Sequence, residues 1–372
     1  MNNEYDTNSL QNLDLIIGNA LRKQIFSACS LGFYKYENGI NFKKCFNYGK
    51  TGIGEGKSIV CEETFYDLAS LTKPLVTSLA ILLLVDKGII TFEDKLSKFF
   101  RGIASDKKEI RLFHLLTHTS GLPAHKPYFK ELEKLSSDSR WDYVLNSILS
   151  EKLDCYPGKK CNYSDLGFIL LGSVIELVAG EKLDIFWEKN ILQPMKIENK
   201  LFFKKIINTE GEIYAETGIC PWSKIKLNGQ VNDDNCRALG GVTGHAGLFG
   251  TILGLLTYVE NISLEIQGNG NIFQFSKETV KAFLESQRNT SWINGFDTPS
   301  ASCSSSGELF SDMSFGHLGF TGTSFWMDIK KSCGVVMLTN RVLCGEDLAP
   351  IKKLRPLIHN LIMSYLKNKV II

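Results

Sequence analysis

The stretch of sequence that decides the fold is LASLTKPLVTSLAILLLVD, residues 68–86. Its apolar residues recur at the spacing of one helix face, which predicts a helix from Ser70 to Asp86. Gly88 follows at a position typical of a helix C-cap. Because this segment is apolar over most of its length, we expect it to be buried, together with the polar side chains of its first turn. The residues of the apolar face are Leu71, Leu75, Val76, Leu79, Leu82 and Leu83.

The first turn of this helix carries Ser70-Leu71-Thr72-Lys73, an S-x-x-K motif. Residues three apart lie on the same helix face, so we expect the Lys73 amine beside the Ser70 hydroxyl. Burial would favour the neutral amine, which accepts a proton, and the helix N-terminus would stabilise an oxyanion. A serine with a neighbouring base is a competent nucleophile. The plainer alternative makes Ser70 a helix N-cap and Lys73 a solvated surface charge.

The composition is that of an ordinary globular chain. The 372 residues are 44% hydrophobic and 22% charged, which excludes disorder as the main state. With 42 Lys and Arg against 40 Asp and Glu, no positive field is present to hold nucleic acid. The longest apolar run, Leu79 to Val85, is too short to span a membrane. The polar N-terminal segment lacks the features of a signal peptide, so we expect a cytoplasmic protein without a membrane span.

Strand patterns occur at both ends of the chain and helical patterns in its middle. Residues 27–39 and 42–50 resemble a hairpin with Glu37-Asn38-Gly39 as its turn. Two further β-like runs occupy 319–329 and 332–340, and helices are expected over 9–25, 166–179 and 349–366. We therefore expect two domains. One is an α/β domain built from 10–66 and 240–372, and the other is a mostly helical domain, 67–239, with the site between them.

The sequence does not match several familiar motifs. GIGEGKS (52–58) lacks the first glycine of a P-loop, since Thr51 stands there, and neither G-x-S-x-G nor H-E-x-x-H occurs. His114, His118 and His125 would be the ligands if the protein were a zinc hydrolase. The run FHLLTHTSGLP reads better as a helix end and a Ser-Gly turn whose histidines bond nearby backbone. We therefore expect no metal.

Two further motifs complete a pattern. Tyr163-Ser164-Asp165 follows the S-x-x-K motif by about 90 residues, and His317-Leu318-Gly319 follows after about 150 more. In this order and spacing the chain resembles the serine β-lactamase and penicillin-binding protein-like hydrolases, in the branch of class C β-lactamases, DD-peptidases and esterases. LLTHTSGLP (115–123) is similar to that family too. GQVNDDNCRALGGVTGHAGLFGT (229–251) resembles a subgroup that usually has V-H-D where this chain has V-N-D.

The resemblance, which covers roughly residues 10–370, implies a fold and a mechanism. The fold would be α/β, a β-lactamase/transpeptidase-like antiparallel sheet flanked by helices with an inserted helical domain. Ser70 would form an acyl-enzyme while Lys73 and Tyr163 share the proton transfers. The N–H groups of Ser70 and Phe320 would form the oxyanion hole. No metal and no organic cofactor is implied. The remaining substrate-binding candidates are Asp165, His317, Gly319 and His245; Gly319 would let the strand approach the substrate closely.

Three departures from the family pattern bear on the substrate. Asp165 replaces the asparagine of β-lactamases, Leu318 replaces a threonine, and His317 replaces a lysine that would face an antibiotic's carboxylate. All three argue against efficient β-lactam hydrolysis. We expect a hydrolase of a small or peptide-like acyl substrate, either a D-alanyl or muropeptide-like amide or an ester. A catalytically silent penicillin-binding-like module and a weak β-lactamase remain the alternatives, and the oligomeric state is open.

Overall fold

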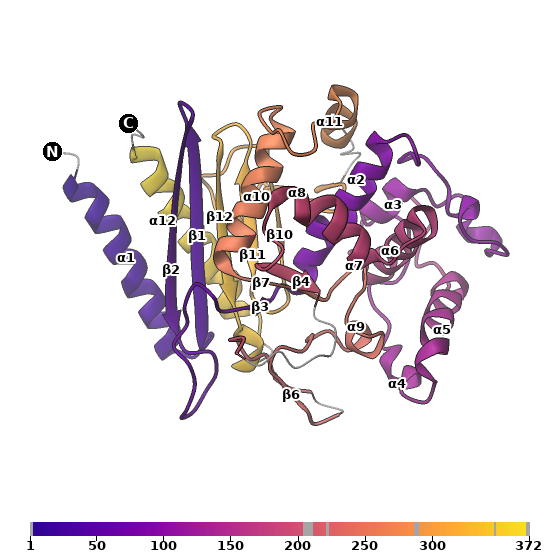
Figure 1. The fold of residues 1–372 in the computed structure, drawn as a ribbon, viewed down its shortest axis with the longest axis horizontal. Helices are drawn as coiled ribbons and strands as arrows, with labels where there is room; N and C mark the ends of the chain where they lie inside the picture. Colours follow the sequence, from indigo (N-terminus) through magenta and orange to yellow (C-terminus); the bar gives the residue numbers. More distant parts are fainter. Residues whose placement is uncertain (1–2, 204–210, 221–222, 286–289, 346, 370–372) are drawn as a thin grey trace.

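A seven-stranded antiparallel sheet forms one half of the molecule (Figure 1). The structure is a computed structural model that describes residues 3–203, 211–220, 223–285, 290–345 and 347–369. The strand order is β2-β1-β12-β11-β10-β9-β8. The strands are β1 (Ala28–Glu37), β2 (Ile40–Gly49), β8 (Trp292–Ile293), β9 (Phe296–Asp297), β10 (Ser314–Leu318), β11 (Ser324–Asp328) and β12 (Cys333–Thr339). The sheet therefore joins both ends of the chain, because β1 pairs directly with β12.

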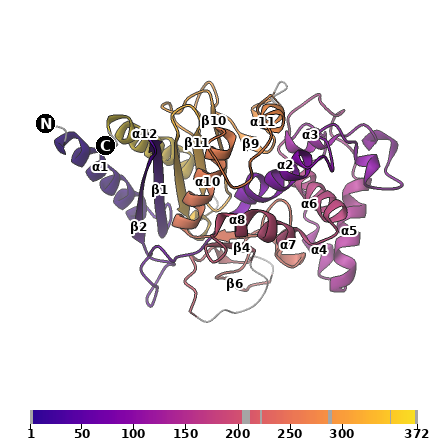
Figure 2. The ribbon, with the colours of Figure 1, turned by 45° about the horizontal axis from the view of Figure 1, so that its top comes forward.

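The predicted hairpin is confirmed. Asn38 and Gly39 both have positive φ, 54° and 79°, as a two-residue turn between twisted strands requires. Alternate residues of β1 then face opposite layers. Leu31 and Phe33 join the cluster formed with α1 (Asn3–Arg22) and α12 (Ala349–Asn368). Gly32 faces α10 (Ile252–Ile266), whose side chains approach it so closely that a larger residue would crowd them. Helices thus cover both faces of the sheet (Figure 2).

The helical half of the molecule is built around the apolar segment of the S-x-x-K motif. This segment is helical from Ala69 to Asp86, as predicted, but not uniformly α. It comprises the 3-10 turn η1 (Ala69–Leu71), the π-helical η2 (Lys73–Ser78) and α2 (Leu79–Asp86). By length and composition the stretch could cross a membrane, but 83% of it is buried inside the protein, as expected of a core helix.

The other helices of this half lie in the centre and on the right in Figure 1. They are α3 (Leu112–Leu116), α4 (Phe129–Leu132), α5 (Ser137–Ser150), α6 (Asp165–Ala179), α7 (Leu183–Trp187), η5 (Glu188–Leu192), α8 (Gln193–Met195), α9 (Asp234–Ala238) and α11 (Lys277–Leu284). Short 3-10 turns are η3 (Leu96–Lys98), η4 (Ser105–Lys107) and η6 (Arg341–Leu343). Since the sheet comes from the chain ends and most helices from the middle, we propose, as the sequence suggested, that 67–239 forms one domain and 10–66 with 240–372 the other.

Two small sheets complete the fold. One has the order β3-β7-β4, with β3 (Tyr66–Asp67), β7 (Leu248–Gly250) and β4 (Leu201–Phe203), and the other pairs β5 (Gly218–Ile219) with β6 (Lys226–Leu227). Strand β3 leads directly into η1. The pairing with β7 therefore fixes where the S-x-x-K turn begins.

Two expectations about the third motif need correction. The strand predicted over 319–329 begins only at Ser324, and a strand not predicted, β10, carries His317 and Leu318. Residues 319–323 instead form the turn between β10 and β11. Gly322 has a φ of 99°, and the Gly319 N–H donates to the Thr323 carbonyl at 2.8 Å. The positive φ at Gly322 interrupts the extended backbone that the β-like composition suggested.

The Gly-rich loop before β7 packs directly against α6, and we predict that Gly244→Ala is destabilising. A Cβ at Gly244 would lie 2.1 Å from the carbonyl oxygen of Phe168, and neither backbone can yield cheaply. We expect a loss of about 1–3 kcal/mol in the free energy of unfolding, measured by urea denaturation. Gly18→Ala, inside α1, is the control: the nearest atom to a Cβ there, Arg22 Nη1, would lie at an ordinary 3.7 Å, and the variant should gain up to about 1 kcal/mol. Equal stability of the two variants would contradict this packing.

Candidate active site

The nucleophile candidate lies on a constrained turn. Ala69, just before Ser70, has a φ of 48°, a left-handed conformation that is costly for a residue other than glycine. The buried carboxylate of Asp67 holds this turn by accepting from the Ala69 N–H at 2.8 Å and from the Asn232 N–H at 2.7 Å. Strain of this kind persists only where the surroundings impose it, and it concentrates at functional sites.

Lys73 lies beside Ser70, as the spacing predicts. Its Nζ donates to Ser70 Oγ at 3.1 Å and to the His245 carbonyl at 3.2 Å. A third contact joins Nζ to Asp165 Oδ1 at 2.7 Å, at the start of α6. The Lys73 side chain is 0% exposed, so these three acceptors match the three N–H bonds of an ammonium group.

The expectation that burial leaves Lys73 neutral is wrong for the resting site. Burial by itself lowers the pKa of Lys73, but the Asp165 carboxylate and Tyr163 together outweigh it, and the pKa of Lys73 is raised well above its ordinary value. Lys73 in turn holds the pKa of Asp165 far below its usual range, against the opposing effect of burial. The pair is therefore an ammonium and a carboxylate at neutral pH.

Tyr163 lies over this ion pair. The Lys73 Nζ is 4.8 Å from the centre of the Tyr163 ring. Burial raises the pKa of the Tyr163 phenol, whereas Lys73 lowers it and Asp165 raises it; the net pKa is raised. The phenol is therefore neutral at rest, and a phenolate formed there would face the Lys73 ammonium.

A cavity of about 380 Å³ opens in front of Ser70 and Tyr163. Besides Tyr163, its titratable lining residues are three aspartates and His125. A larger hollow of about 720 Å³ lies beside α5 and α6, but Ser70 does not line it. The lining of the smaller cavity is Ala69, Ser70, His125, Tyr163, Asp165, Asn232, Asp233, Asp234, Ala246 and Phe320.

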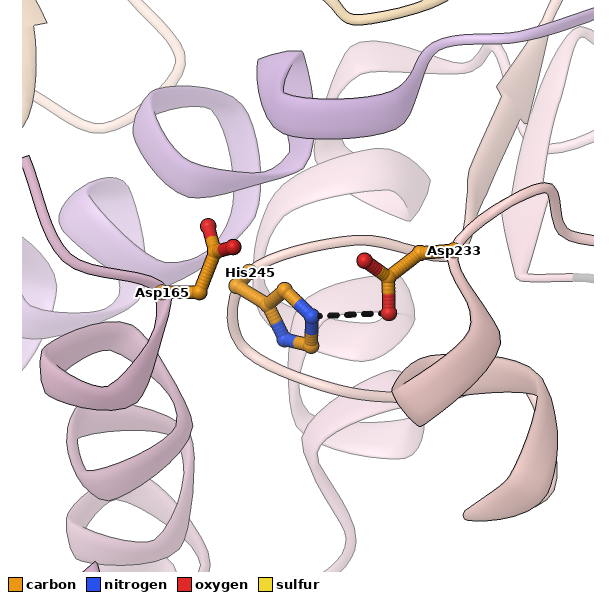
Figure 3. Close-up of side chains that lie close together, drawn as sticks. All are labelled: Asp165, Asp233 and His245. Carbon is orange, nitrogen blue, oxygen red and sulfur yellow. Dashed lines mark hydrogen bonds and ion pairs between the residues drawn. The ribbon is translucent and has the colours of Figure 1, made fainter. Parts of the chain in front are cut away.

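Asp165, Asp233 and His245 form the one group among the described residues with the make-up of a metal site (Figure 3). Their ligand atoms lie within 4.8 Å of one another. His245 Nε2 bonds Asp233 Oδ1 at 3.0 Å, and its Nδ1 bonds Thr243 at 2.8 Å. The Lys73 ammonium already supplies the cation at Asp165, so we assign no metal here. The His245 ring is buried behind Asp233 and does not line the cavity.

The three histidines considered as zinc ligands are dispersed. His114 Nδ1 accepts from the Arg111 N–H at 3.0 Å, and His118 Nδ1 accepts from the Ser164 N–H at 3.1 Å. His125 Nδ1 lies 3.3 Å from Asp165 Oδ2. Two of the three thus bond the backbone, as the sequence suggested, and in the part of the chain that the structure describes they do not converge on one point.

The third motif approaches the site from β10. His317 is buried, and its Nδ1 bonds the Leu318 carbonyl at 2.8 Å. Burial, together with Lys73, lowers the pKa of His317 to about 3, so the ring is neutral and offers no positive charge. A Cβ at Gly319 would lie 2.8 Å from the Leu68 carbonyl, so this glycine lets the motif pack against the Ser70 turn. Phe320 lines the cavity with a ring that is 53% exposed.

This arrangement, with Ser70 and Tyr163 at one cavity and Lys73 beside Ser70, is typical of serine acyl hydrolases. Residues 46–355 match the family described as Beta-lactamase. A relative from Escherichia coli (strain K12), "Putative D-alanyl-D-alanine carboxypeptidase", is 30% identical over 338 residues, covering 82% of this chain and 76% of the relative. A relative of the same description from Salmonella typhi is 30% identical and covers 91% and 84%.

Solved structures share the fold. A class C β-lactamase superimposes with a TM-score of 0.72 at 18% identity, covering 96% of this chain and 99% of that one. The octameric penicillin-binding protein homologue from Pyrococcus abyssi gives 0.71 at 20% identity, with 95% and 77% covered. The chain belongs to the β-lactamase family and is a serine hydrolase. The predicted family, fold class and type of enzyme are confirmed.

Sequence analysis missed several residues of the site. Asp67, which holds the strained turn, carries no motif of its own. Asp233, which binds His245, belongs to the V-N-D run, which the resemblance noted without giving this aspartate a role. The side chain of Trp292 lies 5.4 Å from the rings of both Tyr163 and His317, centre to centre, yet comes from a segment with no signal. His118 belongs to LLTHTSGLP, so the resemblance drew attention to it without giving it a role.

We predict that Asp165→Asn shifts the pH dependence of the reaction to lower pH. The Asp165 charge raises the pKa of both Lys73 and Tyr163, so its removal lowers both, whichever of them accepts the serine proton. The rising limb of kcat/KM against pH, measured with an activated ester, should move down by at least about one unit. Asp106→Asn, at the surface, is the control. An unmoved or upward-shifted limb in the Asp165 variant would contradict the assignment.

Proposed function

We propose that the protein hydrolyses an amide or ester bond of a small or peptide-like acyl substrate through an acyl-enzyme on Ser70. The observation that carries the proposal is the 3.1 Å contact between Lys73 Nζ and Ser70 Oγ, in a cavity that Tyr163 also lines. A serine hydroxyl is a poor nucleophile until a neighbouring group takes its proton. Lys73 and Tyr163 are both candidates for the group that takes this proton.

The proton path follows from the charges. Because Asp165 holds Lys73 as an ammonium, the group that accepts the Ser70 proton is Tyr163, once its phenol has released its own proton to solvent. The Lys73 ammonium stabilises the phenolate that forms. Ser70 Oγ attacks the acyl carbonyl, and Tyr163 then returns the proton to the leaving amine or alcohol. Water attacks the acyl-enzyme by the same route in reverse and restores Ser70.

The oxyanion that forms in each step must accept hydrogen bonds from donors in the site. We propose the N–H groups of Ser70 and Phe320, as the family resemblance implies. The Ser70 N–H lies in the first helical turn, where N–H groups lack a helical acceptor. The Phe320 N–H donates to no carbonyl within the described part of the chain, and Phe320 lines the cavity.

The charges of the cavity suggest the kind of leaving group. Asp165, Asp233 and Asp234 line it, Asp165 being paired with Lys73 and Asp234 with Arg237. The neutral His317 stands where a lysine would bind a carboxylate. A substrate with a free carboxylate next to the scissile bond would therefore be repelled. We propose a D-alanyl or muropeptide-like amide, or an ester, whose leaving group is neutral or cationic; the description of the bacterial relatives supports a D-alanyl acyl group.

We predict that Ser70→Ala abolishes turnover of an activated ester without loss of folding. A fluorophosphonate probe should add once to the wild-type protein and not to the variant, as read by intact-protein mass. Tyr163→Phe should keep the adduct but slow acylation by roughly 10²–10⁴-fold, because it removes the proton acceptor. Turnover retained by Ser70→Ala would refute the acyl-enzyme at Ser70. No adduct on either protein would favour a catalytically silent binding module.

A second prediction tests the charge of the leaving group. N-acetyl-D-alanyl-D-alaninamide and N-acetyl-D-alanyl-D-alanine differ only in the terminal carboxylate. We expect kcat/KM for the amide to be higher by about tenfold or more, because the carboxylate would face the aspartates of the cavity. Asp233→Asn keeps the N-cap of α9. It should reduce the ratio of kcat/KM for the amide to kcat/KM for the free acid. A preference for the free acid would instead support a carboxypeptidase like those the relatives are named for.

A further inference from the structure

One buried histidine outside the three motifs makes three contacts around Tyr163. The carbonyl oxygen of His118 accepts from the Asn162 N–H at 2.8 Å, and its Nδ1 accepts from the Ser164 N–H at 3.1 Å. Its ring lies 4.5 Å from the Tyr163 ring, centre to centre. The residues before and after Tyr163, and the aromatic ring itself, are thus all held by His118.

We propose that His118 is a positioning residue that fixes Tyr163 for proton transfer, acting through its neutral Nδ1 lone pair. The proposal rests on the role of Tyr163 proposed above. It assigns no proton transfer to His118 itself, since the contacts of its carbonyl oxygen and Nδ1 with this segment are to backbone N–H groups.

The contacts define the tautomer. A backbone N–H only donates, so the Nδ1 that binds Ser164 must carry a lone pair, and the proton of the ring lies on Nε2. Nε2 is buried and forms no conventional hydrogen bond with the described residues. The ring of Trp292 lies edge-to-face with His118 at 4.6 Å. Burial and the Lys73 ammonium lower the pKa of His118 well below its usual value, so the lone pair persists at neutral pH.

The backbone at His118 is strained. His118 has a φ of 56°, in the left-handed region that is uncommon for histidine. Ser164 is held from the other side as well, since its Oγ donates to the Pro123 carbonyl at 2.7 Å and caps α6. A strained residue is thus retained where it defines the position of Tyr163. Misplacement of a reacting group by about 1 Å costs up to about 10²-fold in rate.

Two substitutions separate positioning from bulk packing. His118→Asn places an amide oxygen near the position of Nδ1, and asparagine tolerates a positive φ. His118→Leu has no acceptor. We expect kcat for an activated ester to fall by about 10²-fold in the leucine variant, with KM within about twofold of wild type, and to recover to within about tenfold in the asparagine variant. An asparagine variant as slow as the leucine variant would overturn the role of the Nδ1 acceptor.

His114→Asn is the matched control. His114 also accepts a backbone N–H with its Nδ1, from Arg111, but belongs to α3 and makes none of the contacts around Tyr163 described above. We expect its kcat to equal that of the wild-type enzyme. An equal loss in the His114 and His118 variants would mean that both act on the fold alone, and would overturn the proposal.

A double-mutant cycle tests whether His118 acts through Tyr163. In a Tyr163→Phe background, His118→Leu should slow the reaction no further, because the group that it positions is gone. A further tenfold loss would place its effect elsewhere and overturn the proposal. If Tyr163→Phe alone is fully active, the proposed function of Tyr163 fails. If Tyr163→Phe is slow but His118→Leu is not, only the positioning role fails.

A measurement on the wild-type protein keeps the inference testable if His118→Leu does not fold. The side-chain ¹⁵N shifts of His118 should report a neutral ring protonated on Nε2 between pH 5 and 8. A ring protonated on Nδ1, or a charged ring, could not accept the Ser164 N–H and would refute the proposal.

Discussion

The ion pair between Lys73 and Asp165 is the interaction on which the rest of the site depends. An ammonium group with a side chain that is 0% exposed would cost several kcal/mol without a partner. Asp165 supplies that partner from the start of α6, and the His245 carbonyl supplies a further acceptor from the Gly-rich loop. The same lysine thus joins three segments of the chain around Ser70. The position of the proposed nucleophile and the charge of its neighbour are determined together.

Together with burial, which is the larger effect at His118 and His317, this one fixed charge also acts on the groups around it. The Lys73 ammonium contributes to lowering the pKa of both His118 and His317, and it favours the phenolate of Tyr163 against burial. Both histidines are therefore neutral, and each can serve only as a donor or an acceptor of hydrogen bonds. In the proposed mechanism, proton transfer is therefore left to Tyr163.

The sequence predicts what is local and misses what is long-range. The helix from Ser70, the hairpin turn at Asn38-Gly39 and the adjacency of Ser70 and Lys73 follow from spacing alone. The same spacing suggested a neutral lysine, because a burial pattern does not reveal a carboxylate that arrives from another helix. Strand β10 is short and next to Gly319, so composition placed the strand too late.

Under the proposed function, the aspartate at position 165, where β-lactamases have an asparagine, couples acid–base chemistry to substrate choice. The carboxylate faces the cavity on one side and Lys73 on the other, so its charge acts on both. An asparagine would leave the lysine free to lose its proton and would not repel an anionic substrate. With aspartate, an anionic substrate is disfavoured and the ammonium is retained. A positively charged group of the substrate near Asp165 would weaken the attraction of this carboxylate for the Lys73 ammonium and so lower the pKa of Lys73. In the proposed function, specificity and reactivity therefore depend on the same carboxylate.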